Sequence, residues 1–362
     1  VASELLHNNV IAGGSQNNIT ARYSGLSNVI GGGCCNSLNF TNGGGCFNTI
    51  SGGYKNTMAG CNCWSTIAGG RCNSVSNQYA ATNFIGGGCG NNAGGTYGGY
   101  SVIAGGKGNS NYSACGFIGS GASNSLGNYS YRDVIVGGCS NSIYSRGANN
   151  SIVGGFCNAI SSAYAGYGGE GGSIIGSGFR NTISVYNNCE ICKIGFNAIF
   201  GGSKNRIKNF VFGTKNSGSN NFIGGGCLNT GSGNFNFIGS GLDNTIQASN
   251  SVIVGGFRNT SSGNFSSIVG GFKNTASAKF SSIVGGTRNS FRGGSDNSGF
   301  ISHKFIGGGC LNKIGFNGEN SSYSNGKFSS IVGGQENETC QNHSFIGGGR
   351  LNQIDGYANY HG

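Results

Sequence analysis

The residues best suited to chemistry in this chain are its 15 cysteines. Two short motifs, Cys61-x-Cys63 and Cys189-x-x-Cys192, have the spacing of half a zinc site. Neither is followed by a second half at zinc-finger spacing, and the four histidines are scattered: His7, His303, His343 and His361. We therefore expect no metal site and interpret the thiols as free or locally paired side chains that pack as small hydrophobic groups.

Acid–base chemistry would need carboxylates that converge. The 10 acidic residues include one close pair, Glu336-x-Glu338, which we expect to share a turn and to point to solvent. Solenoid enzymes that cleave polysaccharides need paired carboxylates in a cleft. Gly-x-Gly patterns carry no weight as phosphate loops in a chain with 76 glycines. We predict a protein that is not an enzyme and that has no cofactor.

Recognition chemistry is better represented, by tyrosines in Gly/Ser-rich segments. Tyrosine on such segments supplies rigid, amphipathic contact surface, and sugar rings are often held against aromatic faces. The alternative is that these rings cover the chain's own turns or a neighbouring chain. The candidate recognition residues are Tyr97, Tyr100, Tyr129, Tyr131, Tyr164 and Tyr167.

Basic residues form a second candidate surface, because the chain carries 21 Lys and Arg and a net charge of +11. Many of them stand one or two residues before a recurrent asparagine, as do Arg258, Lys273 and Arg288. Aligned along one edge, they could meet an anionic polysaccharide or cell surface. The alternative is a solvated edge that keeps a β-sheet protein soluble. No recognition helix, zinc finger or RNA-binding motif accompanies them, so we expect no nucleic-acid partner.

A short sequence motif that recurs about nineteen times must position all these residues. It reads FIGGGCLN over residues 222–229, with isoleucine six residues and glycine three residues before a closing asparagine. In the most regular stretch the asparagine returns every 15 residues, at Asn229, Asn244, Asn259, Asn274 and Asn289. Such a period indicates one stacked supersecondary unit. Two weaker copies, ending at Asn48 and Asn216, stand too close to their neighbours to be whole turns, and we interpret them as decoration.

The unit is too short for a pair of helices, and a Gly-Gly step before asparagine favours a chain turn. We predict an all-β parallel β-solenoid (a β-roll or β-helix) of about 19 turns, with a second short strand near residues 275–277. It spans residues 1–362 as a single domain, with loop-rich insertions within 74–200 and 290–330. Isoleucine forms the core stack and asparagine a hydrogen-bonded ladder. The core stack is expected to contain Ile223, Ile238, Ile253, Ile268 and Ile283.

The residue before each isoleucine should face outward, because successive side chains in a strand alternate. It is often Phe or Val, as at Phe222, Phe237 and Val252, and in some coils Ser. An outer column of apolar residues needs a cover, and self-association about a long axis would supply it.

Residues 250–263, NSVIVGGFRNTSSG, resemble the repeat of trimeric autotransporter adhesin heads and the related repeats of phage and viral tail fibres. The resemblance covers nearly the whole chain in rhythm and is greatest over residues 220–290. It implies a left-handed parallel β-roll in which three chains pack side by side. It also implies that the outer apolar residue points at the trimer axis.

We expect a structural fibre or adhesin whose loops attach to a host cell surface or glycan, located extracellularly or on a virion. A viral or phage fibre is favoured because bacterial surface adhesins usually avoid cysteine. A bacterial adhesin and a self-assembling extracellular filament remain alternatives. An ice-binding solenoid is another, since Thr230, Thr245 and Thr260 continue to Thr275 as a regular column. The expected partners are further copies of the chain, as a homotrimer or filament. No run of 18 apolar residues is present, so we expect no membrane span and no export signal.

Overall fold

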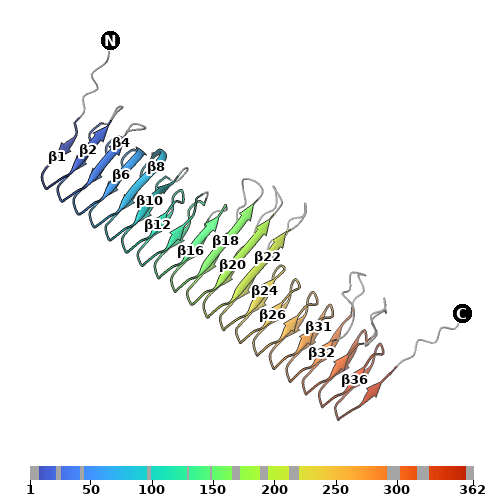
Figure 1. The fold of residues 1–362 in the computed structure, drawn as a ribbon. Helices are drawn as coiled ribbons and strands as arrows, with labels where there is room; N and C mark the ends of the chain where they lie inside the picture. Colours follow the sequence, from blue (N-terminus) through green and yellow to red (C-terminus); the bar gives the residue numbers. More distant parts are fainter. Residues whose placement is uncertain are drawn as a thin grey trace. The chain divides into compact units, whose positions relative to one another are not determined.

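The computed structural model describes residues 8–21, 26–40, 45–95, 99–128, 130–146, 149–164, 172–187, 195–211, 220–291, 302–315 and 326–355. Within these ranges the regular elements are β-strands, and each coil contributes one odd-numbered and one even-numbered strand (Figure 1). The chain divides into two compact units, residues 1–194 with 211–216, and residues 195–210 with 217–362. Each unit is a parallel β-solenoid, so the predicted fold class is confirmed.

In the first unit, the odd-numbered strands pair in parallel and in register, isoleucine opposite isoleucine. They are β1 (Val10–Ile11), β3 (Val29–Ile30), β5 (Thr49–Ile50), β7 (Thr66–Ile67), β9 (Phe84–Ile85), β11 (Val102–Ile103), β13 (Phe117–Ile118), β15 (Val134–Ile135), β17 (Ser151–Ile152) and β19 (Ser173–Ile175). The even-numbered strands form a second parallel sheet. They are β2 (Asn18–Ala21), β4 (Ser37–Phe40), β6 (Thr57–Asn62), β8 (Ser74–Ala81), β10 (Asn92–Gly95), β12 (Ser110–Asn111), β14 (Ser125–Leu126), β16 (Ser142–Ser145), β18 (Ala159–Tyr164) and β20 (Thr182–Asn187).

The second unit repeats this arrangement. Its odd-numbered strands are β21 (Asn197–Ile199), β23 (Phe222–Ile223), β25 (Phe237–Ile238), β27 (Val252–Ile253), β29 (Ser267–Ile268), β31 (Ser281–Ile283), β33 (Lys304–Ile306), β35 (Ser329–Ile331) and β37 (Phe345–Ile346). Its even-numbered strands are β22 (Arg206–Val211), β24 (Thr230–Ser232), β26 (Thr245–Ile246), β28 (Thr260–Ser261), β30 (Thr275–Ala276), β32 (Ser290–Phe291), β34 (Lys313–Ile314), β36 (Glu338–Thr339) and β38 (Gln353–Ile354). A third side of each coil is made by single bridges at the turn, as between Phe257 and Phe272.

Isoleucine fills the interior from the odd-numbered strands. Ile238, Ile253 and Ile268 are fully buried, whereas the residue before each is half-buried or exposed. The even-numbered strands send their second residue inward, and this position varies more, from Ile246 to Ala276. Each two-residue strand therefore contributes one inward side chain to the core. Because successive side chains along a strand point to opposite faces, the residues on either side of an inward one point outward.

The recurrent asparagine links three successive coils. The backbone N–H of Asn259 donates to Oδ1 of Asn244 at 3.0 Å. Nδ2 of Asn259 donates to the carbonyl of Gly255 in its own turn at 3.1 Å and to that of Gly271 in the next coil at 3.0 Å. The buried amide is therefore satisfied on both ends, which a buried polar group requires. No other side chain of this size supplies the same acceptor and two donors.

A second buried polar ladder runs at the opposite corner, and it corrects the interpretation of Asn48 as decoration. Asn48 is fully buried, its backbone N–H donates to Oδ1 of Asn28 at 3.0 Å, and its Nδ2 donates to the Asn62 carbonyl at 2.8 Å. Ser65 continues the row by donating its N–H to Asn48 Oδ1 at 3.0 Å. The sequence repeat did not reveal this row because several residue types occupy it, among them Asn28, Ser65 and Asp133. Asn216 lies outside the described residues.

Length variation is confined to one corner of the coil. The interval from the isoleucine of each odd-numbered strand to the next even-numbered strand is constant, from Ile11 to Asn18 in the first coil and from Ile346 to Gln353 in the last. The segments outside the described residues, apart from the two chain ends, all follow an even-numbered strand and precede the next odd-numbered one. Both sheet faces are therefore uninterrupted by insertions. We call this variable corner the insertion corner.

Candidate functional site

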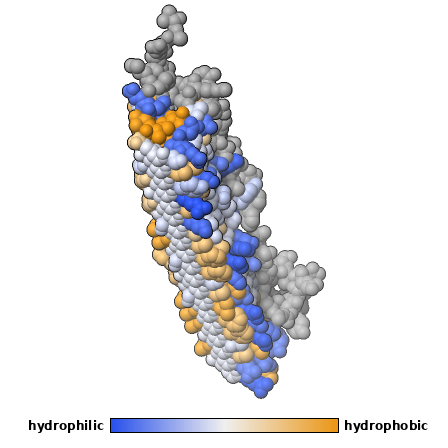
Figure 2. All heavy atoms as spheres, turned by 60° about the vertical axis from the view of Figure 1, so that its left-hand side comes forward, coloured by the Kyte–Doolittle hydropathy of each residue, from blue (hydrophilic) through white to orange (hydrophobic). Residues whose placement is uncertain are grey.

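An uncharged face covers the outer side of the odd-numbered strands. It consists of the outward residue of each strand and the residue two places later, and neither position holds Asp, Glu, Lys or Arg in any coil of the described ranges. We call it the apolar face. In the view of Figure 2, hydrophobic residues (orange) form rows along part of the surface of the coils. About half of each side chain is exposed at its larger members, which include Val136, Val153, Val254, Val269, Val284 and Val332.

Bulk on the apolar face is balanced between its two positions. Every phenylalanine at the first position is followed by glycine at the second, and a methyl group added to Gly239 would lie 3.4 Å from Cε1 of Phe237. The ring therefore lies over the glycine of its own strand. Where the first position is Ser267 or Ser282, the second is valine instead. In these coils a large side chain at one position therefore stands beside a small one at the other.

The candidate recognition tyrosines are only partly described. Tyr100 and Tyr131 lie at the insertion corner and are exposed. Tyr97, Tyr129 and Tyr167 lie outside the described residues, and the side chain of Tyr164, at the end of β18, does too. In the second unit the same corner carries a row of rings with neighbouring centroids 4.8 to 5.5 Å apart, stacked at its two ends and tilted at His303: Phe265, Phe280, His303, Phe328 and His343.

The basic edge forms a short row. Arg258, Lys273 and Arg288 occupy equivalent turns of successive coils, and Asp243 and Leu311 stand at this position in the coils on either side. Their charges are partly occupied within the chain. Arg258 Nε lies 3.1 Å from Asp243 Oδ2, and its guanidinium carbon lies 4.8 Å from the Phe257 ring centre. An exposed ion pair of this kind contributes little to stability. The row therefore offers less free charge than its sequence suggests.

Several cysteines within the described ranges, among them Cys72, Cys89 and Cys115, are free thiols, and these ranges contain no group of three or more His, Cys, Asp or Glu arranged to hold a metal ion. Cys46 and Cys63 are register partners in adjacent coils. Burial raises the pKa of the Cys63 thiol, which favours the neutral thiol over the metal-binding thiolate. Cys189 and Cys192 lie outside the described residues.

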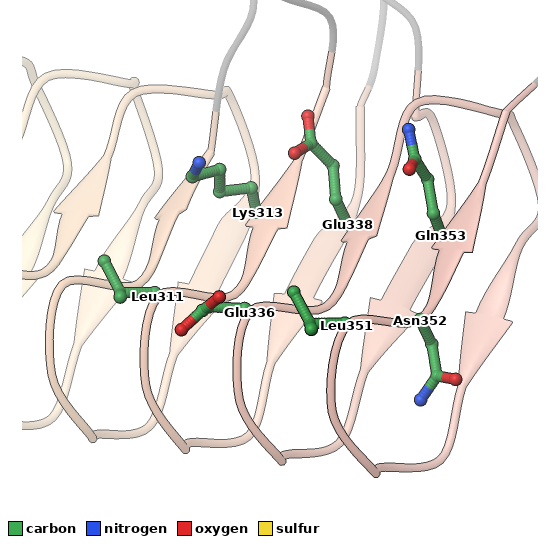
Figure 3. A pocket seen from close by; sticks show the side chains of 7 residues that line it. All are labelled: Leu311, Lys313, Glu336, Glu338, Leu351, Asn352 and Gln353. Atoms are coloured by element: carbon green, nitrogen blue, oxygen red, sulfur yellow. The ribbon is translucent and has the colours of Figure 1, made fainter.

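A shallow groove of about 330 Å³ lies on the last coils of the second unit. Leu311, Glu336 and Leu351 form one of its rows and Lys313, Glu338 and Gln353 the other, with Asn352 completing the lining (Figure 3). Glu336 and Glu338 therefore stand on opposite sides of the groove. The lining contains no serine or cysteine that could act as a nucleophile, and no histidine that could act as a base near neutral pH.

The second polar ladder contains one carboxyl group, that of Asp133, which is fully buried. Its Oδ1 accepts hydrogen bonds from the backbone N–H and from Nδ2 of Asn150, at 2.9 and 3.0 Å. Burial raises the pKa of Asp133 from 3.8 to about 6, an effect that the Asn150 hydrogen bonds partly offset. The folded protein therefore holds this proton more tightly than the unfolded chain.

This pKa predicts that the protein loses stability as pH rises. Between about pH 4 and pH 6 the unfolded chain releases the Asp133 proton while the folded chain keeps it, so the free energy of unfolding falls by up to about 3 kcal/mol and stays low above pH 6. Asp133→Asn should remove this loss, because asparagine is the ladder's own residue at Asn150. Urea unfolding at about pH 4 and pH 8 tests the prediction. A wild-type protein equally stable at both values would contradict it.

Two tyrosines on the outer face of the even-numbered strands were not among the residues predicted from the sequence. Tyr112 directly follows β12, and Tyr144 lies within β16. The phenol oxygen of Tyr112 accepts a hydrogen bond from Asn92 Nδ2 at 2.9 Å, and that of Tyr144 lies 3.0 Å from Ser125 Oγ. Each ring thus reaches back across the preceding coil. Both tyrosines could have been found in the sequence from their position in the coil. The recognition tyrosines, however, were predicted to lie in insertions.

Comparison with known protein families finds no match to this chain, and comparison with curated proteins finds no significant relative. Among the described residues, no helix has the length and apolarity needed to cross a bilayer.

Proposed function

We propose that this chain is a non-enzymatic subunit of a structural fibre that displays its insertions for attachment to a cell surface or glycan. The observation that carries the proposal is that every insertion leaves from one corner, while the rest of the coil keeps a constant length. A scaffold of this kind lets loops vary without disturbing the isoleucine and asparagine stacks. The exposed Tyr100 and Tyr131 at this corner support a role in recognition.

Assembly in this proposal uses the apolar face. In each unit a face without charge, carrying half-exposed valine and phenylalanine, has the composition of a contact surface. Another copy of the chain would present the same uncharged face and could cover it. We propose a homotrimer in which the apolar faces cover one another, as the resemblance to trimeric fibre repeats implies.

The free thiols favour a viral or phage fibre over a bacterial adhesin. Cysteines such as Cys72 and Cys115 are exposed on the coils. A protein assembled in a reducing cytoplasm tolerates such thiols, whereas secreted proteins tend to pair or avoid them. In this proposal the protein acts on the virion surface. A self-assembling filament would differ from such a fibre only in having no receptor to bind.

An ice-binding surface is a second candidate function. Thr230, Thr245, Thr260 and Thr275 are direct register partners on the outer face of their sheet. Regular hydroxyl spacing is the feature that an ice surface would match. The threonine column ends at Thr275, because Ser290 and Lys313 stand at the next two positions. Inhibition of ice recrystallisation by the purified protein would favour this candidate over the fibre.

Charges on the apolar face should abolish assembly. We expect the double variant Val254→Lys and Val269→Lys to remain folded, because both side chains are about half exposed, at 48% and 49%. It should be monomeric, because two ammonium groups would be buried in each contact. Thr260→Lys is the matched control, since lysine already stands at that coil position at Lys313. Light scattering measures the mass, and an assembled double variant would refute a role for this face.

A further inference from the structure

Tyr112 and Tyr144 form two equivalent platforms on the even-numbered sheet of the first unit. The ring of Tyr144 covers Gly127 of the preceding coil, where an added methyl group would lie 3.0 Å from Cε1. At Gly95, beside Tyr112, an added methyl group would lie 3.3 Å from Cβ of Tyr112. The hydrogen bonds from each phenol to Asn92 and Ser125 hold the rings in place. Both platforms therefore exist before any ligand arrives.

The platforms recur on alternate strands. Tyr112 follows β12 and Tyr144 lies in β16, and β14 separates the two strands in the sheet. Neighbouring strands lie about 4.8 Å apart, so the coils that carry the platforms are about 10 Å apart. Tyr144 is 56% exposed, so much of its ring is open to solvent.

The surface between the platforms is polar but uncharged. In the first unit, the first and third positions of the even-numbered strands hold no Lys, Arg, Asp or Glu within the described ranges. Ser110, Ser125 and Ser142 form a register column beside the rings. A nucleic acid would need cations at these positions to neutralise its phosphates. Hydroxyl groups beside aromatic faces instead match the two sides of a sugar, its hydroxyl edge and its C–H face.

The stacked rings at the insertion corner of the second unit cannot serve in the same way. The Phe265 and Phe280 rings lie 4.8 Å apart at an interplanar angle of 10°, so each occupies a face of the other. A ring in the middle of that row presents only its edge to a ligand. The exposed part of Tyr144, in contrast, lies on a sheet surface with glycine beneath it.

We propose that this sheet face binds a linear, neutral β-linked glycan that runs along the stacking direction of the strands. In an extended β-linked hexose chain every second ring presents the same face, at a repeat close to the spacing of two strands. Alternate sugars would lie on Tyr112 and Tyr144, with their C–H groups against the electron-rich ring faces. The seryl hydroxyls would bond the sugar edges. This inference rests on the proposed attachment function and names its ligand class.

Calorimetric titration of the full chain with a β-1,4-linked glucose hexamer and a β-1,4-linked N-acetylglucosamine hexamer tests the inference. At least one should bind, and an α-1,4-linked glucose hexamer, which is helical and not extended, should not. The double variant Tyr112→Ala and Tyr144→Ala should bind roughly tenfold or more weakly. Tyr54→Ala, which removes an exposed ring on the turn side of the coil, should bind like the wild type.

Further variants make the outcome decisive. The double variant Tyr112→Phe and Tyr144→Phe keeps the rings and should retain most of the binding. It therefore tests the inference even if the alanine variant fails to fold. Wild-type protein that binds neither β-linked hexamer, or an alanine variant that binds with unchanged affinity, would overturn the inference. Deletion of residues 96–98 separates the two proposals. If cell attachment is lost in that deletion but persists in the alanine variant, the attachment function stands and the sheet site is wrong.

Discussion

Gly271→Ala is expected to unfold the coils around it. Gly271 has a φ of +95°, and a Cβ there would run into the Gly286 carbonyl oxygen and lie 2.5 Å from Asn274 Nδ2. The substitution therefore strains the backbone and breaks the asparagine ladder at the same point. We expect a loss on the order of 4 kcal/mol in the free energy of unfolding. Urea unfolding of the variant, with amide hydrogen exchange in the flanking coils, measures it.

The neighbouring glycine provides the control. A Cβ added at Gly270 meets no atom within 4 Å, so Gly270→Ala should change the free energy of unfolding by less than about 1 kcal/mol. The two substitutions add the same methyl group to adjacent residues. Equal effects of the two would show that the turn is not built as described.

Ile268→Asn is expected to be the most damaging change in the core. Ile268 is fully buried between Ile253 and Ile283, its register partners on either side. Asparagine there would remove apolar contacts and bury an amide among side chains that offer no hydrogen bond. We expect a cost on the order of 4 kcal/mol or more. Thermal melting followed by circular dichroism should show a large drop for the coils of the second unit.

The residue before it gives the matched comparison. Ser267 is half-buried on the outer side of the same strand, where its Oγ lies 2.9 Å from Ser282 Oγ. Ser267→Asn should therefore cost less than about 1 kcal/mol, because the new amide remains in contact with solvent. A melting temperature that falls as far for Ser267→Asn as for Ile268→Asn would invert the assignment of the two faces.

The coil was predictable because its strict positions have single physical solutions. Isoleucine faces the interior, glycine avoids the contact described at Gly271, and asparagine satisfies three coils at once, as at Asn259. Each requirement returns with every coil, so the repeat displays it many times in one sequence. Periodicity therefore indicated the strands, the turn and the direction of the side chains.

The second polar ladder and the tyrosine platforms were not predictable in the same way. The ladder accepts Asn48, Ser65 or Asp133, because several short polar side chains can accept the next N–H. A position that several residue types fill leaves no strict signal. Tyr112 and Tyr144 gain meaning only when the coils are stacked, since each bonds a residue of the preceding coil.

The mass of the native protein in solution tests the proposed fibre most directly. The apolar face carries no charge in any described coil and leaves about half of each larger valine exposed, so it should be covered by other copies of the chain. Light scattering at low protein concentration should give three times the 36.6 kDa mass of the chain. A stable monomer under the same conditions would contradict the account and leave the apolar face without its proposed partner.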